Sequence, residues 1–166
     1  MSVFKIEEIH GGWIDGYIED QNNHIDFSYS YITDFLGDLL DAFFVVLNNE
    51  RKSGIVCTEI EPGADFWKIT YADNKMVIGL FLYEKHKDFI STIEYDPDFK
   101  EKIDKEDEDY RFSFEKEEFI SNFMSEIENN IDEYNNNYLK PYPNNSRTTD
   151  DLKRYCINIR ELLSKN

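Results

Sequence analysis

Few of the residues that build common catalytic and metal sites occur in this chain of 166 residues. It has only two cysteines, Cys57 and Cys156, and three histidines, with no CxxC pair, HExxH or GxSxG motif. The cysteine spacing therefore excludes a zinc-ribbon framework, and the usual signals of a metalloprotease or an α/β-hydrolase are missing. Because neither cysteine has a partner nearby in sequence, we expect both to be reduced, buried thiols.

Long apolar runs and basic residues are scarce as well. No apolar stretch approaches the roughly 20 residues that a bilayer-spanning helix needs. Residues 1–8 lack the basic and apolar regions of a signal peptide, so we expect a cytoplasmic protein that does not bind membranes. Only 18 Lys and Arg stand against 35 Asp and Glu, a net charge of -17. This charge disfavours nucleic acid and favours a basic protein partner, although solubility alone explains it equally well.

Enough apolar surface is present for one compact domain over residues 1–166. Hydrophobic residues make up 40% of the chain and aromatic residues 16%, which argues against disorder. Periodicity predicts strands at 3–9, 13–19, 25–29, 55–61, 65–72, 75–83 and 89–95, and helices at 32–47, 114–138 and 150–164. The hairpin pattern predicts an α+β fold, a mainly antiparallel sheet of about six or seven strands with three helices packed against it. Strand 75–83, apolar on both faces, is expected to be the most central.

Turn residues refine this prediction. Tight turns are expected at His10-Gly11-Gly12 and at Asp73-Asn74, and a type II turn at Glu61-Pro62-Gly63-Ala64. Ser30 or Thr33 is a suitable N-cap for helix 32–47, and Gly37 inside that helix indicates close approach to the sheet. In strand 13–19 both faces carry large apolar side chains, so its buried face stays ambiguous.

Acidic residues concentrate in two regions. Residues 96–109 hold eight acids against three lysines, which predicts a solvated acidic loop at about residues 96–111. Acids at helical spacing lie on the outer side of helix 32–47. Aromatic residues interleaved with acids suit a basic protein partner, because aromatics anchor and acids steer. The candidate partner-binding residues are Asp34, Asp38, Asp41, Asp15, Tyr17, Glu106, Asp107, Asp109 and Tyr110, with Trp13 and Glu19 beside Tyr17.

Carboxylate chemistry provides the alternative hypotheses. Asp34, Asp38 and Asp41 are spaced to reach one divalent cation, and Glu59 and Glu61 share one side of a strand. A solvated helix face or strand edge explains both patterns more simply. We therefore expect no cofactor and no metal site, and a protein that is not an enzyme. A carboxylate-based metal-binding protein or enzyme and an oligomeric accessory domain stay open as alternatives.

The segment Phe27-Ser28-Tyr29-Ser30-Tyr31-Ile32-Thr33-Asp34-Phe35-Leu36-Gly37-Asp38-Leu39-Leu40, followed by Glu61-Pro62-Gly63, carries a family resemblance. It resembles small acidic, aromatic-rich α+β proteins of bacteria that are encoded as immunity proteins beside polymorphic or contact-dependent toxins. The resemblance implies a cytosolic protein that binds and blocks a toxin domain, often a basic nuclease. It assigns no functional residue in this chain.

Overall fold

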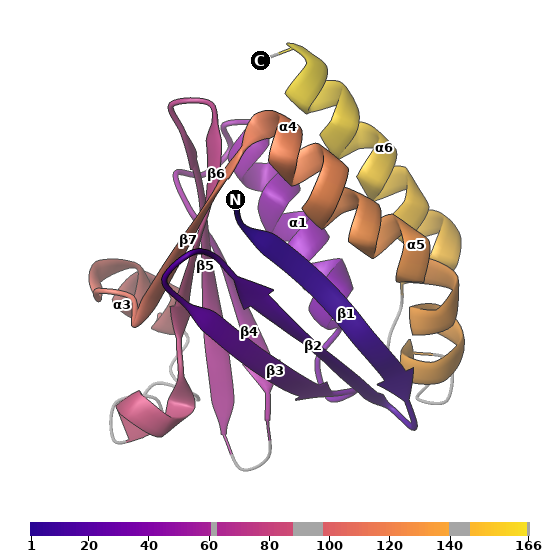
Figure 1. The fold of residues 1–166 in the computed structure, drawn as a ribbon, viewed down its shortest axis with the longest axis horizontal. Coiled ribbons are helices and arrows are strands. Elements are labelled where there is room, and N and C mark those ends of the chain that lie inside the picture. Colours follow the sequence, from indigo (N-terminus) through magenta and orange to yellow (C-terminus); the bar gives the residue numbers. More distant parts are fainter. Residues whose placement is uncertain (61–62, 88–97, 140–146, 166) are drawn as a thin grey trace.

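The computed structural model describes residues 1–60, 63–87, 98–139 and 147–165. Its elements form two antiparallel sheets with helices packed between and beside them (Figure 1). The first sheet has the order β1-β2-β3 and the second β4-β5-β6-β7. The strands are β1 (Val3–His10), β2 (Trp13–Glu19), β3 (His24–Ser30), β4 (Gly54–Glu59), β5 (Ala64–Ala72), β6 (Lys75–Phe81) and β7 (Tyr110–Glu115). The single sheet of the prediction is therefore divided in two, while its antiparallel pairing and its α+β class are confirmed.

The helices outnumber the predicted three. They are α1 (Phe35–Leu47), α3 (Phe99–Lys105), α4 (Lys116–Glu118), α5 (Ser125–Tyr134) and α6 (Thr149–Lys165), with π-helical segments η1 (Phe119–Met124) and η2 (Asn135–Leu139). Residues 83–87 are helical as well. Residues 116–139 form one continuous helical run, the counterpart of predicted helix 114–138. In the described residues no helix is long and apolar enough to cross a bilayer.

The predicted acidic loop is wrong over part of its length, because it contains a helix and the start of a strand. Phe99 and Ile103, one helical turn apart in α3, cover Phe66 and Phe81 on the outer side of the second sheet. Strand β7 then alternates inward aromatic residues with outward polar ones, a period of two that the acidic surroundings obscured. The predicted strand 89–95 lies outside the described residues. The predicted Glu59–Glu61 pair cannot be followed either, because Glu61 and the side chain of Glu59 are not described.

Local turn predictions are confirmed where they can be followed. Gly11 and Gly12 both have positive φ between β1 and β2, and Asp73 and Asn74 do the same between β5 and β6. Such turns match the twist of antiparallel hairpins. Strand β6 lies between β5 and β7, in the interior of its sheet as predicted.

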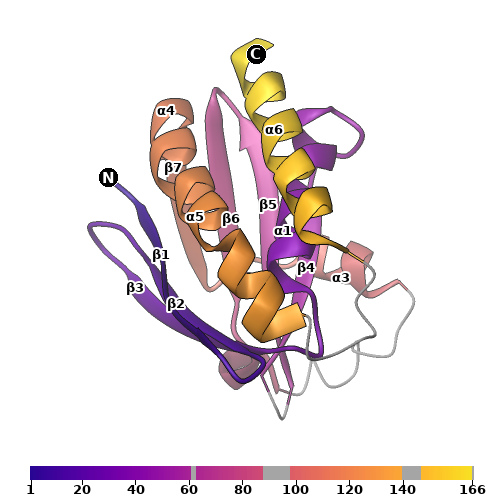
Figure 2. The ribbon, with the colours of Figure 1, turned by 90° about the vertical axis from the view of Figure 1, so that its right-hand side faces the viewer.

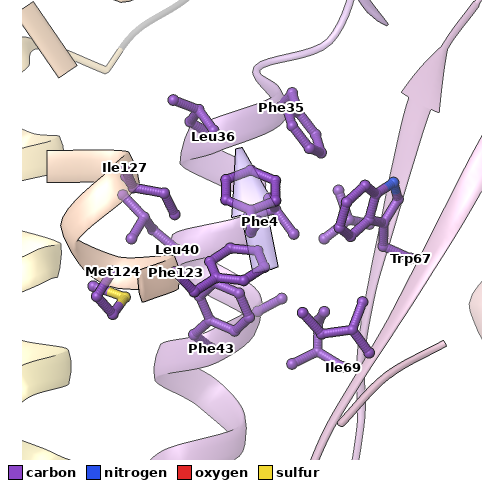
Figure 3. Packing of buried hydrophobic residues seen from close by; sticks show 14 of the residues in the cluster. Phe4, Phe35, Leu36, Leu40, Phe43, Trp67, Ile69, Phe123, Met124 and Ile127 are labelled. Atoms are coloured by element: carbon purple, nitrogen blue, oxygen red, sulfur yellow. The ribbon is translucent and has the colours of Figure 1, made fainter. Parts of the chain in front are cut away.

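One aromatic core joins both sheets to the helices (Figure 3). Phe4 of β1 stacks on Phe123 with ring centroids 3.9 Å apart and meets Trp67 of β5 edge-on at 6.3 Å. Phe43 of α1 packs edge-on against the same Phe123 at 5.3 Å. These residues are at most 1% exposed, so the first sheet shares its buried side with the second sheet and with α1.

The helical run of residues 116–139 lies beside β1 (Figure 2), and its side chains close the outer edge of that strand. The backbone N–H groups of Ser2, Phe4 and Ile6 donate to Glu118, Asn122 and Glu126 at 2.8 to 3.0 Å. Two residues of strand advance about 6.7 Å and four residues of helix about 6 Å, so the two series stay in step. The edge is thereby protected against pairing with another strand, and the face of β1–β3 opposite the core is left open.

Candidate functional site

The outward side of the first sheet gathers acids and aromatic residues from all three strands. Cross-strand register places Tyr17 between Lys5 and Asp26, and Asp15 between Glu8 and Ser28. We call this surface the acidic face; it comprises Lys5, Glu8, His10, Trp13, Asp15, Tyr17, Glu19, His24, Asp26 and Ser28, all exposed or half-exposed. The ambiguity of strand 13–19 is resolved, because Ile14, Gly16 and Ile18 take the buried side.

A β-bulge in β1 brings Glu8 onto the acidic face. Ile6 and Ile9 are both buried although they lie three positions apart, an odd spacing that a regular strand cannot bury on one side. The register shifts between Ile6 and Glu8, so that Glu8 faces Asp15 directly across the strands. That odd spacing was the sequence signal for the bulge, and the sequence prediction missed Glu8.

Within the described residues, the carboxylates of the acidic face have no lysine or arginine as ion-pair partner. Lys5 turns to the helical run and meets Glu126 at 2.8 Å. Asp15 lies 2.9 Å from Nε2 of His10, and it also accepts a hydrogen bond from Ser28. Among the described residues, the basic partners of these acids are therefore imidazoles, and the face keeps an exposed excess of negative charge.

His24 lies between two of these acids. Its Nδ1 is 2.8 Å from Glu19 and its Nε2 is 3.0 Å from Asp26, while its ring stacks on Tyr17 with centroids 4.9 Å apart. The hydrogen bonds to Glu19 and Asp26 raise the pKa of His24 above its usual 6.5. Sequence reasoning assigned His24 a surface role and did not connect it with Tyr17, because their proximity depends on the pairing of β2 with β3.

Asp34 and Asp38 belong to a different environment, the Arg147 cluster, which comprises Asp34, Asp38, Tyr134, Tyr138 and Arg147. Nη1 of Arg147 lies 2.8 Å from Asp34 and 2.7 Å from Asp38, and Tyr134 donates to Asp34 at 2.9 Å. Burial opposes the charge of Arg147, but hydrogen bonds to both aspartates outweigh it and raise its pKa. A guanidinium therefore fills the place that the metal hypothesis gave to a divalent cation.

The N-cap of α1 is part of the same cluster. The Asp34 side chain, 6% exposed, accepts from the backbone N–H of Gly37 at 3.2 Å, so the cap is Asp34 and not Ser30 or Thr33. A Cβ on Gly37 would lie 2.2 Å from the Asp34 carboxylate and 2.7 Å from Arg147. The glycine thus permits close approach of this ion pair, and not of the sheet as predicted.

A groove of about 530 Å³ runs between α1, β4 and α3. Asp38 and Asp41 line one side of it, with Arg51 and Lys100 among its other lining residues. Asp41 also accepts a hydrogen bond from Tyr155 of α6 at 3.2 Å. Charges of both signs line this groove, so it carries less net negative potential than the acidic face.

The remaining candidates follow α3. Glu106 ends that helix and is exposed with Asp107, whereas Asp109 accepts from the backbone N–H of Leu82 and lies 2.9 Å from His86. Tyr110 lies under the ammonium of Lys85, 4.2 Å from its ring centroid. The structure therefore divides the nine sequence candidates among three places, and only Asp15 and Tyr17 lie on the acidic face.

The two cysteines lie in different environments. Cys156 is buried within α6, and burial raises its pKa to about 12, far from a reactive thiolate. Cys57 is half-buried on β4, and the two cysteines form no disulfide. No family model, characterised protein or solved structure matches this chain.

Proposed function

We propose that this chain is an inhibitory binding protein that holds a basic protein domain against its acidic face. The observation that carries the proposal is the state of the acids there. Among the described residues of that face, Glu8, Asp15, Glu19 and Asp26 lack a lysine or arginine partner. Lysines and arginines of a docked partner would supply that missing charge.

The shape and composition of the acidic face support a protein partner. Three strands with a covered outer edge form a rigid surface, and such surfaces dock with little loss of conformational entropy. Tyr17 is half-exposed in the middle strand and Trp13 is half-exposed at the turn end of the same strand, and aromatic side chains of this kind serve as binding anchors. The flanking acids would steer a basic partner and fix its orientation.

The toxin-blocking role rests on the resemblance together with this charge distribution. A basic nuclease has to attract phosphates, so its substrate site is positively charged. An acidic face of the same extent would cover that site and exclude the nucleic acid. We therefore infer that the partner is a basic toxin domain and that inhibition occurs by direct contact.

The experiment uses the C-terminal domain of the protein encoded immediately upstream as the partner. Isothermal titration of the full chain should give a 1:1 complex. We expect affinity to fall at least about tenfold between roughly 50 and 300 mM NaCl, since screening weakens exposed charge pairs. An affinity indifferent to salt would refute the electrostatic argument.

A pair of matched charge reversals localises the contact. Asp15→Lys with Asp26→Lys should weaken binding by about 100-fold or more, because like charges across an interface cost several kcal/mol. The control, Glu115→Lys with Glu108→Lys, changes the net charge equally on the outward side of the second sheet. Equal losses from both double variants would contradict the assignment of the acidic face.

A further inference from the structure

Glu8, His10 and Asp15 direct three ligand atoms toward one point on the acidic face. One atom from each residue, an imidazole nitrogen and two carboxylate oxygens, lies within 4.8 Å of the other two. The bulge supplies Glu8, the end of β1 supplies His10, and β2 supplies Asp15. The three residues thus come from one hairpin whose register fixes their relative positions.

The charges at this point are unbalanced. Glu8 and Asp15 face each other directly across antiparallel strands, where like charges destabilise a sheet. Among the described residues, His10 is their nearest basic group, at 2.9 Å from Asp15. A bound cation would remove the repulsion between the carboxylates, and His10 would then ligate that cation in its neutral form.

We propose that Glu8, His10 and Asp15 bind a divalent transition-metal ion, with Zn²⁺ as the best match. Imidazole with carboxylate oxygens favours zinc and its neighbours, whereas Ca²⁺ and Mg²⁺ prefer oxygen ligands alone. Ligand bonds of about 2.0–2.2 Å bring such atoms within about 3–4 Å of one another. Small rotations of these partly exposed side chains achieve that spacing without moving the strands.

Three protein ligands leave at least one coordination position open. In zinc sites, three protein ligands with an open position take water or an external ligand there. The site is on the surface of the sheet, so the external ligand can come from a docked molecule. This inference is independent of the proposed function, because the metal alone tests it.

The same face contains an internal control of equal composition. His24 has two carboxylates within 3.0 Å, but Glu19 meets its Nδ1 and Asp26 meets its Nε2. The two ring nitrogens point in different directions, so one ion cannot be bound by His24 and both acids together. If Glu8, His10 and Asp15 chelate the ion, removal of His24 should leave zinc binding unchanged. If zinc is only attracted by the negative charge of the face, removal of His24 should weaken binding as much as removal of His10.

The experiment titrates the chelator-treated full chain with ZnCl₂ at about pH 7.5, because zinc binds imidazole in its neutral form. We expect one saturable site in calorimetry, with the imidazole resonances of His10 shifted in NMR spectra and those of His24 unmoved. His10→Ala should weaken binding at least about tenfold, and His24→Ala should leave it within about twofold.

Two outcomes would overturn the proposal. Equal weakening by His10→Ala and His24→Ala would identify diffuse attraction to an acidic surface, as would binding of Mg²⁺ with the affinity of Zn²⁺. Circular dichroism of each variant checks its fold, and Glu8→Gln serves as a second variant that removes a ligand while keeping the size of the side chain. Retained zinc affinity in Glu8→Gln would remove Glu8 from the site.

Discussion

Acids are used in opposite ways in the Arg147 cluster and on the acidic face. In the cluster, Asp34 is buried and shared between a helix cap, a tyrosine hydroxyl and a guanidinium. On the acidic face, Asp15 and Asp26 are exposed beside histidines. The first arrangement joins distant segments of the chain, and the second leaves negative charge available to an external cation or a basic partner.

The difference shows that the net charge of -17 is a poor guide to function when it is taken as one number. Part of it stabilises the fold, as when Glu118 and Glu126 accept from the backbone of β1. Another part is neutralised locally, as on the outer side of the second sheet, where Lys75 pairs with Glu115 at 2.7 Å. On the first sheet, by contrast, Glu8, Asp15, Glu19 and Asp26 have no lysine or arginine partner among the described residues.

The comparison predicts the largest effect on stability for Asp34→Ala. The substitution leaves Arg147 without its buried partner and removes the cap of α1, so the free energy of unfolding should fall by about 3–5 kcal/mol. Urea denaturation measures the loss. Asp15→Ala, from the acidic face, should change stability by no more than about 0.5 kcal/mol; comparable losses in the two variants would abolish the distinction between these acids.

A third kind of acid, Asp65, sharpens the comparison because it is buried and has no ion-pair partner in the part of the chain that the structure describes. It accepts from the backbone N–H of Tyr83 at 2.8 Å and lies near the hydroxyl of Tyr29, which also accepts from Trp67. Burial raises the pKa of Asp65 to about 6. The native protein therefore holds this proton more tightly than the unfolded chain does.

We predict that Asp65→Asn removes a pH-dependent part of the stability. With a folded pKa above the unfolded one, the contribution of Asp65 is fully present below about pH 3.8 and is lost as pH rises through about 6. A shift of this size corresponds to about 3 kcal/mol. The difference in unfolding free energy, variant minus wild type, should increase between pH 4 and pH 7; a difference constant over that range would contradict the prediction.

Whether a contact in these two regions could be predicted from the sequence depends on how many residues separate its two partners along the chain. Alternation within β2 was enough to bring Asp15 and Tyr17 to one side of a strand. Helical spacing was likewise enough to bring Asp34 near Asp38. The partner of both, Arg147, is 113 residues beyond Asp34, and no local pattern indicates that pairing.

The division into two sheets was missed for a related reason. Hairpin turns reveal that β1, β2 and β3 pair in order, and that β5 pairs with β6, because each turn is local. No hairpin turn joins β3 to β4, because α1 separates them in the sequence, and their arrangement depends on the shared core around Phe4, Phe43 and Trp67. Strand β7 and helix α3 were hidden because charged residues surround their few apolar ones.

The smallest predicted effect concerns His24 on the acidic face. Because Glu19 and Asp26 raise its pKa, its NMR titration should give a value above 6.5, and the double variant Glu19→Gln with Asp26→Asn should return it to about 6.5. The stabilisation from the protonated ring is fully present below about pH 6.5 and is lost as pH rises through the folded pKa. As the ring loses its proton the face becomes more negative, so affinity for a basic partner should increase over the same interval. A titration at or below 6.5 in the wild type would mean that the two acids do not act on this ring in solution.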